Sequence, residues 1–388
     1  MTRIPSEVEL EISKFCNNIR QHTYVRSVDI ALATVLILKK LIGESTWTDS
    51  GELIQLIRSQ ANRLNEGQSI DSITFNIIRR ILKLIREESS RILHGRHEGD
   101  MPLTLQGFSE TVSRTEEKEN DQTLNQKSAD GTETDVENVA VQKPALTSDN
   151  VPMINLKPEL MFSLNEYNFE IGESGKMISR ESIQHIHANE LILTLGHSHT
   201  VEEFFKYAAS KKRKFQVFVM EQAPYFSGHI MAKNLADLNI NVTVVTDSAV
   251  FALMARINKI IIGTRSLLAN GGLTAKCGTY NLALAAKHYS VPLLVCAAAY
   301  KFSPTYLPSF DPVMCNSFDS PELILPYNDR MQSSLDVIVP MYDYVPPELV
   351  TLIISSGQGN APSYVYRLVS ELYHADDNDL ERQNRTIS

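Results

Sequence analysis

The chain has 388 residues, of which 43% are hydrophobic, and its formal net charge is −9. This length is enough for at least one large core and for two or three domains, while the negative charge argues against a chain-wide nucleic-acid surface. No run approaches 18 consecutive apolar residues, and the first residues lack the apolar core of a signal peptide, so we expect a cytosolic protein without a membrane span.

Residues 1–95 are expected to form an N-terminal helical bundle, because apolar residues recur there at helical spacing with few breakers. The first two stripes are Val8, Ile12, Phe15 and Ile19, and then Ile30, Ala33, Leu36, Ile37 and Leu41. A third helix is predicted to start at Ser50 as its N-cap, and a fourth is predicted over residues 71–93.

The predicted fourth helix carries isoleucines on one side and basic residues largely on the other, namely Arg79, Arg80, Lys83 and Arg86. One interpretation is a solvated face with i, i+4 pairing, such as Lys83 with Glu87. The other is a docking face for an acidic or phosphorylated partner, because arginine binds phosphate through paired hydrogen bonds.

A polar, acidic segment follows the helical region. Residues 96–150 contain twelve Asp and Glu against five Lys and Arg, so this stretch carries a net charge of −7. It has almost no aromatic residues and cannot bury enough apolar area to offset the entropy of ordering. We therefore predict a disordered linker or insert over residues 96–152.

Residues 153–388 are predicted to form an α/β domain with a doubly wound parallel sheet, because apolar strands and amphipathic helices alternate along them. A helical region over residues 154–188, with a break at the GESGK sequence, leads into the first strand. The main strands are expected at residues 190–196, 215–221, 241–246, 259–263 and 292–297. The helices between them are expected at residues 200–210, 228–238, 248–257 and 279–288, and Thr279 is the expected N-cap of the last. Two edge strands, at residues 337–341 and 352–355, and a final helix over residues 361–373 complete the pattern.

Several residues of this half are candidates for metal binding, anion binding or catalysis. The turn with His197 and His199 lacks a third metal ligand, and an i, i+2 pair on a turn cannot both face one ion, so we expect no metal site. Gly196 could leave backbone amides pointing at an anion, or could serve only a tight turn. The glycine-rich turn over residues 267–279 lacks a nucleotide fingerprint. Cys277 within it is either a nucleophile with an activating base or a half-buried thiol.

The four cysteines are scattered without C-x-x-C spacing, at Cys16, Cys277, Cys296 and Cys315. This spacing argues against a disulfide framework and a zinc knuckle, and it favours reduced thiols.

Long stretches of the chain resemble the alpha, beta and delta regulatory subunits of eukaryotic translation initiation factor two B, and the beta subunits most of all. The resemblance is carried by HANELILTLGHSHTVEEFF, KRKFQVFVMEQAP, VTDSAVFALMARINKIIIGT, LANGGLTAKCGT, FDSPE, YDYVPPELVTLIIS and GNAPSYVYRLVSELYH, and in the first half by TWTDSGELIQLIR and RRILKLIREE. It implies a helical N-terminal domain followed by a Rossmann-like domain, and no cofactor.

The same superfamily contains sugar-phosphate isomerases, which supply the rival hypothesis of a self-sufficient, homo-oligomeric enzyme. The resemblance implies that these enzymes use a cysteine, an arginine and an aspartate at positions matching Gly196, Ala223 and Gly272. None of the three side chains is present here, so we expect no isomerase activity.

The resemblance further implies a non-catalytic subunit that joins the alpha, delta, gamma and epsilon subunits of a guanine nucleotide exchange factor. Its expected partner is initiation factor two, and above all the phosphorylated alpha subunit of that factor. In the family, a small-molecule pocket crosses the two-fold axis of the assembly. The matching positions here are His187, Asn189, Leu191, Gln216, Phe218, Thr243 and Val245, for which ordinary packing at a subunit interface is the alternative.

Overall fold

The computed structural model describes residues 5–21, 23–24, 26–65, 72–94, 153–306, 316–326, 335–378 and 380. The segment predicted to be a disordered linker, residues 96–152, lies outside this description, as does Cys315. No helix among the described residues is both long and apolar enough to cross a membrane.

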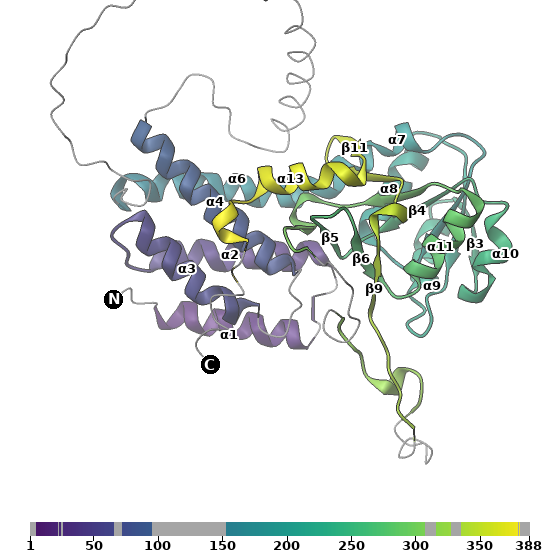
Figure 1. Cartoon of the computed structure of the whole chain (residues 1–388), viewed down its shortest axis with the longest axis horizontal. Helices are drawn as coiled ribbons and strands as arrows, with labels where there is room; N and C mark the ends of the chain where they lie inside the picture. Colours follow the sequence, from purple (N-terminus) through teal and green to yellow (C-terminus); the bar gives the residue numbers. More distant parts are fainter. Residues whose placement is uncertain are drawn as a thin grey trace, which may run out of the picture.

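The N-terminal part is helical, as predicted, and lies beside the sheet domain (Figure 1). Its helices are α1 (Ser6–Arg20), α2 (Ser27–Glu44), α3 (Ser50–Leu64) and α4 (Ile73–His94). The first predicted stripe faces inward, with Ile12 fully buried, and so does Leu41 of the second. Leu36 of the second stripe was placed wrongly, since it is 49% exposed. The expected cap of the third helix was wrong by one residue. Asp49 is the N-cap and accepts a hydrogen bond from the Glu52 amide at 2.8 Å, because its carboxylate satisfies an otherwise free N–H of the first turn.

The long helix α6 (Met153–Arg180) crosses from the bundle to the sheet domain, and it contacts α2, α4 and α8. The predicted break at its GESGK sequence does not occur. Two glycines in a helix cost about 1 kcal/mol each, but Ile171 and Ile178 on either side are buried against neighbouring helices, and this packing holds the helix together. Because α6 contacts both halves of the molecule, a domain boundary at residue 153 stays a prediction.

The predicted parallel sheet is confirmed. Within the described residues, its seven strands follow the order β11-β10-β7-β4-β1-β2-β3, and only the β10–β11 pair is antiparallel. The strand at residues 352–355 was expected at an edge, but β11 pairs with its outer side. The strands are β1 (Leu191–Leu195), β2 (Gln216–Met220), β3 (Asn241–Val245), β4 (Lys259–Gly263), β7 (Leu293–Cys296), β10 (Leu352–Ser355) and β11 (Gln358–Asn360). After β3 the chain returns to the other side of β1, so the order reverses between β1 and β4. Ligand sites of such sheets lie at this switch point, beyond the carboxyl ends of the strands.

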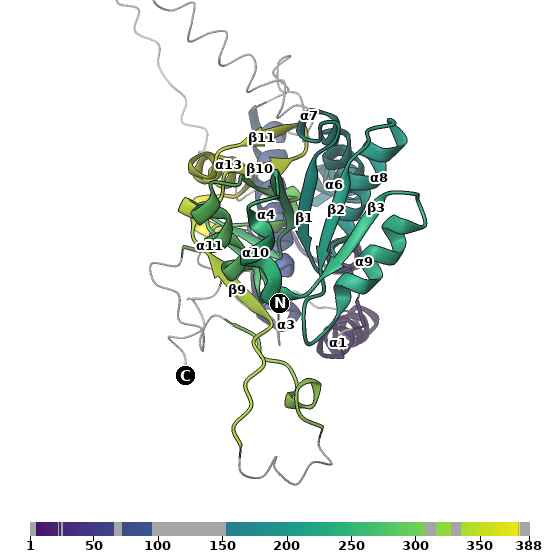
Figure 2. The same ribbon diagram turned by 90° about the vertical axis from the view of Figure 1, so that its right-hand side faces the viewer.

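Helices cover both faces of the sheet, as a doubly wound fold requires (Figure 2). One face, with Ile192 and Val217, packs on α6, α8 (His199–Ser210) and α9 (Ser227–Ala236). The other face, with Leu193 and Ile260, packs on α10 (Val250–Met254), α11 (Thr279–Tyr289) and α13 (Val365–Leu372).

A second, four-stranded sheet corrects three expectations. Its order is β8-β5-β6-β9, from β8 (Phe302–Ser303), β5 (Ser266–Leu268), β6 (Leu273–Lys276) and β9 (Tyr342–Val345). Residues 267–279 are therefore mainly an antiparallel hairpin, because three leucines beside its two glycines are fully buried. The edge strand expected at residues 337–341 lies instead at β9. The earlier run exposes Ile338 and offers only one bridge, through Pro340, whereas β9 finds a partner in β6.

The third correction concerns the start of α11. Gly278, with φ at +96°, is the N-cap in place of Thr279. The first amides of the helix are satisfied from a distant strand, since the Asp343 carboxylate on β9 accepts hydrogen bonds from the Gly278 N–H at 2.7 Å and the Tyr280 N–H at 3.1 Å. A carboxylate is favourable there because the N-terminus of a helix carries a partial positive charge.

Candidate functional site

The candidate site lies at the carboxyl ends of β1 and β2, where Gly196 and Ala223 follow their strands. The structure brings these two turns together through Gln222, which neighbours Ala223 and reaches Gly196. The third predicted position, Gly272, immediately precedes β6, and the last residue of that strand, Lys276, contacts the Gly196 turn. The three positions are therefore linked by this short strand.

Position 196 has no free space for a side chain. Gly196 has φ at +56°, a conformation that favours glycine, and a Cβ built on it would lie 2.4 Å from Gln222 Oε1 and 2.8 Å from Ser227 Oγ. The backbone is also satisfied internally, because the Gly196 N–H donates to Met220 O at 3.1 Å and the His197 N–H donates to Ser227 Oγ at 3.0 Å. The interpretation of this turn as open amides aimed at an anion is therefore wrong.

Position 272 is equally closed. A Cβ on Gly272 would lie 2.7 Å from the Tyr344 hydroxyl oxygen and 2.8 Å from Tyr344 Cε2. The loop is held by Asn270, which accepts the Gly272 N–H at 2.9 Å and donates to the Tyr344 hydroxyl at 2.9 Å. An acidic side chain at this position would have to displace that tyrosine.

Lys276 provides the positive charge of the site. Its Nζ donates to His197 O at 2.8 Å, to Ser227 Oγ at 3.2 Å and to Gln222 Oε1 at 3.3 Å. Burial among these neutral acceptors lowers the pKa of the Lys276 amine to about 8. The amine therefore holds the β1 and β2 turns together at a cost in desolvation.

His197, the histidine of the turn after β1, contacts a buried carboxylate, that of Glu202. Glu202 is only 4% exposed, and its carboxylate contacts His197 Nε2 at 2.7 Å, Lys206 Nζ at 2.7 Å and Asn234 Nδ2 at 3.1 Å. Burial opposes ionisation of Glu202, but the hydrogen bonds from Lys206, His197 and Asn234 outweigh it and lower the pKa of the carboxyl. Across the described part of the chain, no three His, Cys, Asp or Glu side chains are placed to hold a metal ion.

Cys277 is not activated. Burial, together with the neighbouring Asp343 carboxylate, raises the pKa of the Cys277 thiol to about 11, which disfavours the thiolate needed for nucleophilic attack. The geometry supports the half-buried thiol. Cys16 and Cys296 are buried free thiols.

Five of the seven predicted interface positions lie on β1, β2 and β3, toward the β3 edge of the sheet. Leu191, Gln216, Phe218, Thr243 and Val245 share one sheet face, as the pairing of Leu191 with Gln216 and of Phe218 with Thr243 requires. Gln216 Nε2 donates to Thr243 Oγ1 at 3.2 Å. The other two positions, His187 and Asn189, are exposed in the turn before β1. The structure thus brings the set together, and its role as an interface or a pocket stays a prediction.

The four basic residues of α4 are largely buried, so the interpretation as a solvated face was wrong, while their role as a docking face stays a prediction. Arg79 is 1% and Arg80 is 7% exposed. Lys83 donates to Glu371 O, and it also lies 3.7 Å from the Glu87 carboxylate, which is the i, i+4 pair expected from the sequence. Arg86 contacts Asp377 at 3.3 Å. The chain's own C-terminal residues cover this side of α4, and the sequence could not predict this because they lie nearly 300 positions away.

The sequence did not predict the roles of several other residues that make polar contacts in the structure. Gln222, Ser227 and Lys276 form the polar contacts of the switch point, while Arg58 and Asp377 join α3 to the C-terminal segment. The only sequence signal for Asp377 is the acidic run after the final helix, and a run of this kind is usually solvated.

Comparison with known proteins shows the family to which the chain belongs. The model of the Initiation factor 2 subunit family matches residues 25–362, and the chain belongs to this family. It is 36% identical over 371 residues to the translation initiation factor eIF2B subunit beta of Dictyostelium discoideum, with 94% of this chain and 95% of that protein covered. It is 33% identical over 374 residues to the subunit of the same name from Schizosaccharomyces pombe, with 90% and 92% covered.

Solved structures share the fold. The structure of eIF2B beta from Chaetomium thermophilum has a TM-score of 0.66 at 20% identity and covers 96% of this chain and 93% of its own. The tetrameric eIF2B-beta2-delta2 complex from C. thermophilum gives 0.65 at 20% identity, with 94% and 95% covered. The 5-methylthioribose 1-phosphate isomerase from Pyrococcus horikoshii OT3 gives 0.55 at 17% identity, with 93% and 87% covered. At such identities the likeness concerns the fold alone.

Proposed function

We propose that this chain is the beta regulatory subunit of the guanine nucleotide exchange factor for initiation factor two. The observation that carries the proposal is the near full-length similarity to two proteins named eIF2B subunit beta, at 36% and 33% identity. The proposed role is structural and regulatory, in the cytosol, with no cofactor and no direct contact with nucleic acid.

A non-catalytic role is supported by the filled switch point. A Cβ at position 196 would overlap Gln222, a Cβ at position 272 would overlap Tyr344, and Ala223 carries no charge for a substrate phosphate. The alternative, a sugar-phosphate isomerase, has the shared fold in its favour. An assay of the purified chain with 5-methylthioribose 1-phosphate tests it, and turnover at an enzymic rate would overturn the regulatory proposal.

Assembly is proposed to use the face of β1, β2 and β3 that carries Phe218 and Thr243. Its support is that β3 is the edge strand of the sheet and that five of the seven matching positions lie on this face. Because one of the solved structures that share the fold is an eIF2B-beta2-delta2 tetramer, a delta subunit is the first partner to test. The alpha, gamma and epsilon subunits complete the proposed complex.

The proposed partner signal is phosphorylation of the alpha subunit of initiation factor two. Docking through Arg79, Arg80, Lys83 and Arg86 would require the C-terminal segment to leave them, so the proposal does not rest on these four residues. The test is to assemble the five-subunit complex with and without this chain and to measure GDP release from initiation factor two. We expect the complex lacking this chain to lose inhibition by the phosphorylated factor; inhibition that persists would remove the sensing role.

A further inference from the structure

The residues after α13 leave the sheet domain and lie on the N-terminal helices (Figure 1). Three residues of this segment are buried, with Tyr373 at 5%, Asp377 at 0% and Leu380 at 6% exposed. Leu380 belongs to the same apolar cluster as the core of the helical bundle, whereas Tyr373 belongs to the cluster on the α10, α11 and α13 face of the sheet. The segment therefore touches both halves of the molecule.

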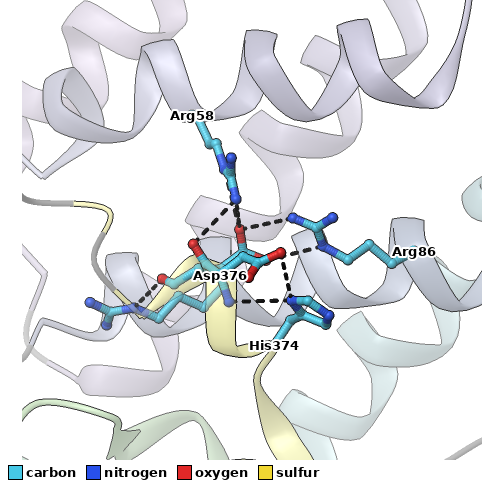
Figure 3. A network of polar contacts seen from close by, with 6 residues as sticks. Arg58, Arg86, His374 and Asp376 are labelled. Atoms are coloured by element: carbon cyan, nitrogen blue, oxygen red, sulfur yellow. Dashed lines mark hydrogen bonds and ion pairs between the residues drawn. The ribbon is translucent and has the colours of Figure 1, made fainter. Parts of the chain in front are cut away.

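Two arginines from different helices bind the Asp377 carboxylate. Arg58 of α3 donates to Oδ1 from Nη2 at 2.5 Å and from Nε at 3.2 Å. Arg86 of α4 donates from Nη2 to Oδ1 at 3.3 Å and from Nε to Oδ2 at 3.4 Å. Figure 3 shows these arginines converging from two helices on the turn that carries His374 and Asp376.

A third arginine donates hydrogen bonds to the backbone of the same turn. Arg79 donates from Nε to Asp377 O and from Nη2 to Asn378 O, both at 3.3 Å. Its Nη1 donates to Asn76 Oδ1 at 3.2 Å, and Asn76 donates in turn to Tyr300 O at 3.3 Å. Because Tyr300 follows β7, the α4 side chains connect the C-terminal turn to the sheet domain as well as to the bundle.

We propose that residues 373–378, together with Leu380, form a C-terminal clamp that holds the helical bundle against the sheet domain, with Asp377 as its central residue. A carboxylate without solvent exposure is retained only where cations and donors compensate its desolvation, and here those groups come from two helices of the bundle. The contacts are directional, so the clamp holds one relative placement of the two halves. At the sheet end, the Tyr373 hydroxyl donates to Phe302 O at 2.6 Å.

Hydrogen exchange of the full-length chain, measured by mass spectrometry, tests the clamp. Asp377→Asn keeps the size of the side chain and removes its charge. We expect peptides of α4 and of residues 371–380 to exchange at least about tenfold faster in this variant, because an uncompensated arginine pair is left behind. Peptides of β1 and β2 should be unchanged.

The matched control is Asp376→Asn, one residue earlier, where the side chain is 67% exposed and contacts only His374 within the described residues. It should exchange like the parent chain. Equal exchange of the two variants would overturn the proposal. If Asp377→Asn is insoluble, the same measurement on the parent chain tests the clamp. The Asp377 and Asn378 amides donate to His374 O and Ala375 O, so their exchange should be slowed to within about tenfold of that of the α4 amides. Exchange of these amides at the rate of an unstructured peptide would refute the clamp.

Discussion

The side-chain oxygen Oε1 of Gln222 lies only 2.4 Å from the position that the Cβ of any larger residue at Gly196 would occupy. Gln222 is in turn held by Ser227 and Lys276, so it cannot move without loss of hydrogen bonds at the switch point. The closed site is thus built by neighbours of the glycine as well as by the glycine itself.

Gly196→Ala should lower the free energy of unfolding by about 1 to 3 kcal/mol, because it combines a strained positive φ with this overlap. Urea unfolding measures the change. The control is Gly175→Ala, at a position in α6 where a Cβ meets nothing within 4 Å, and it should stabilise the chain by up to about 1 kcal/mol. Equal effects of the two substitutions would contradict the packing described at Gly196.

The amine of Lys276 should make stability depend on pH. Its pKa is about 8 in the folded chain and near 10.5 when exposed, so between these values the unfolded chain binds more protons and stability rises with pH. From pH 7 to pH 9.5 this group adds up to about 2 kcal/mol. Lys276→Met should reduce the rise in urea unfolding by that amount; an unchanged rise would mean that the amine is not desolvated.

Cys277 should react slowly with iodoacetamide at pH 8, because burial and Asp343 raise the pKa of its thiol to about 11. Asp343→Asn removes the nearby negative charge and should speed alkylation several-fold, as read from the peptide that contains Cys277. Asp49→Asn, which neutralises the capping carboxylate of α3, is the control and should leave the rate unchanged. If alkylation is not faster in the Asp343→Asn variant, the carboxylate does not contribute to the raised pKa of the Cys277 thiol, and burial is its sole cause.

Thr243→Arg should weaken co-purification with a tagged delta subunit by about tenfold or more, because it places an unpaired charge on the face proposed for assembly. The thermal stability of the isolated chain should change little, since Thr243 is half-buried on the edge strand. Asp237→Arg, an exposed change at the end of α9, introduces the same residue elsewhere and should have no effect on pairing. If both variants co-purify equally well, the proposed face is wrong.

Local rules accounted for most of the elements. Leu191–Leu195 and Lys259–Gly263 are short apolar runs, and the helices between strands carry one apolar face each, so the parallel sheet followed from the pattern. The rules failed where distant contacts outweighed local preference. The α6 helix runs through its two glycines because other helices pack around it, and β9 replaced the strand expected at residues 337–341 because β6 was available to pair with it.

By itself, the sequence determined the helical and α/β halves and the positions of the main strands, because these depend on residue type and short-range periodicity. The family followed from long stretches that resemble its members. Only the tertiary structure decided what surrounds each polar group. Arg79 and Asp377 are 298 positions apart, yet the arginine donates to the backbone of the aspartate, and so a helix side that reads as solvated is buried. The physical reason is that burial and charge compensation depend on neighbours in space, which periodicity along the chain does not encode.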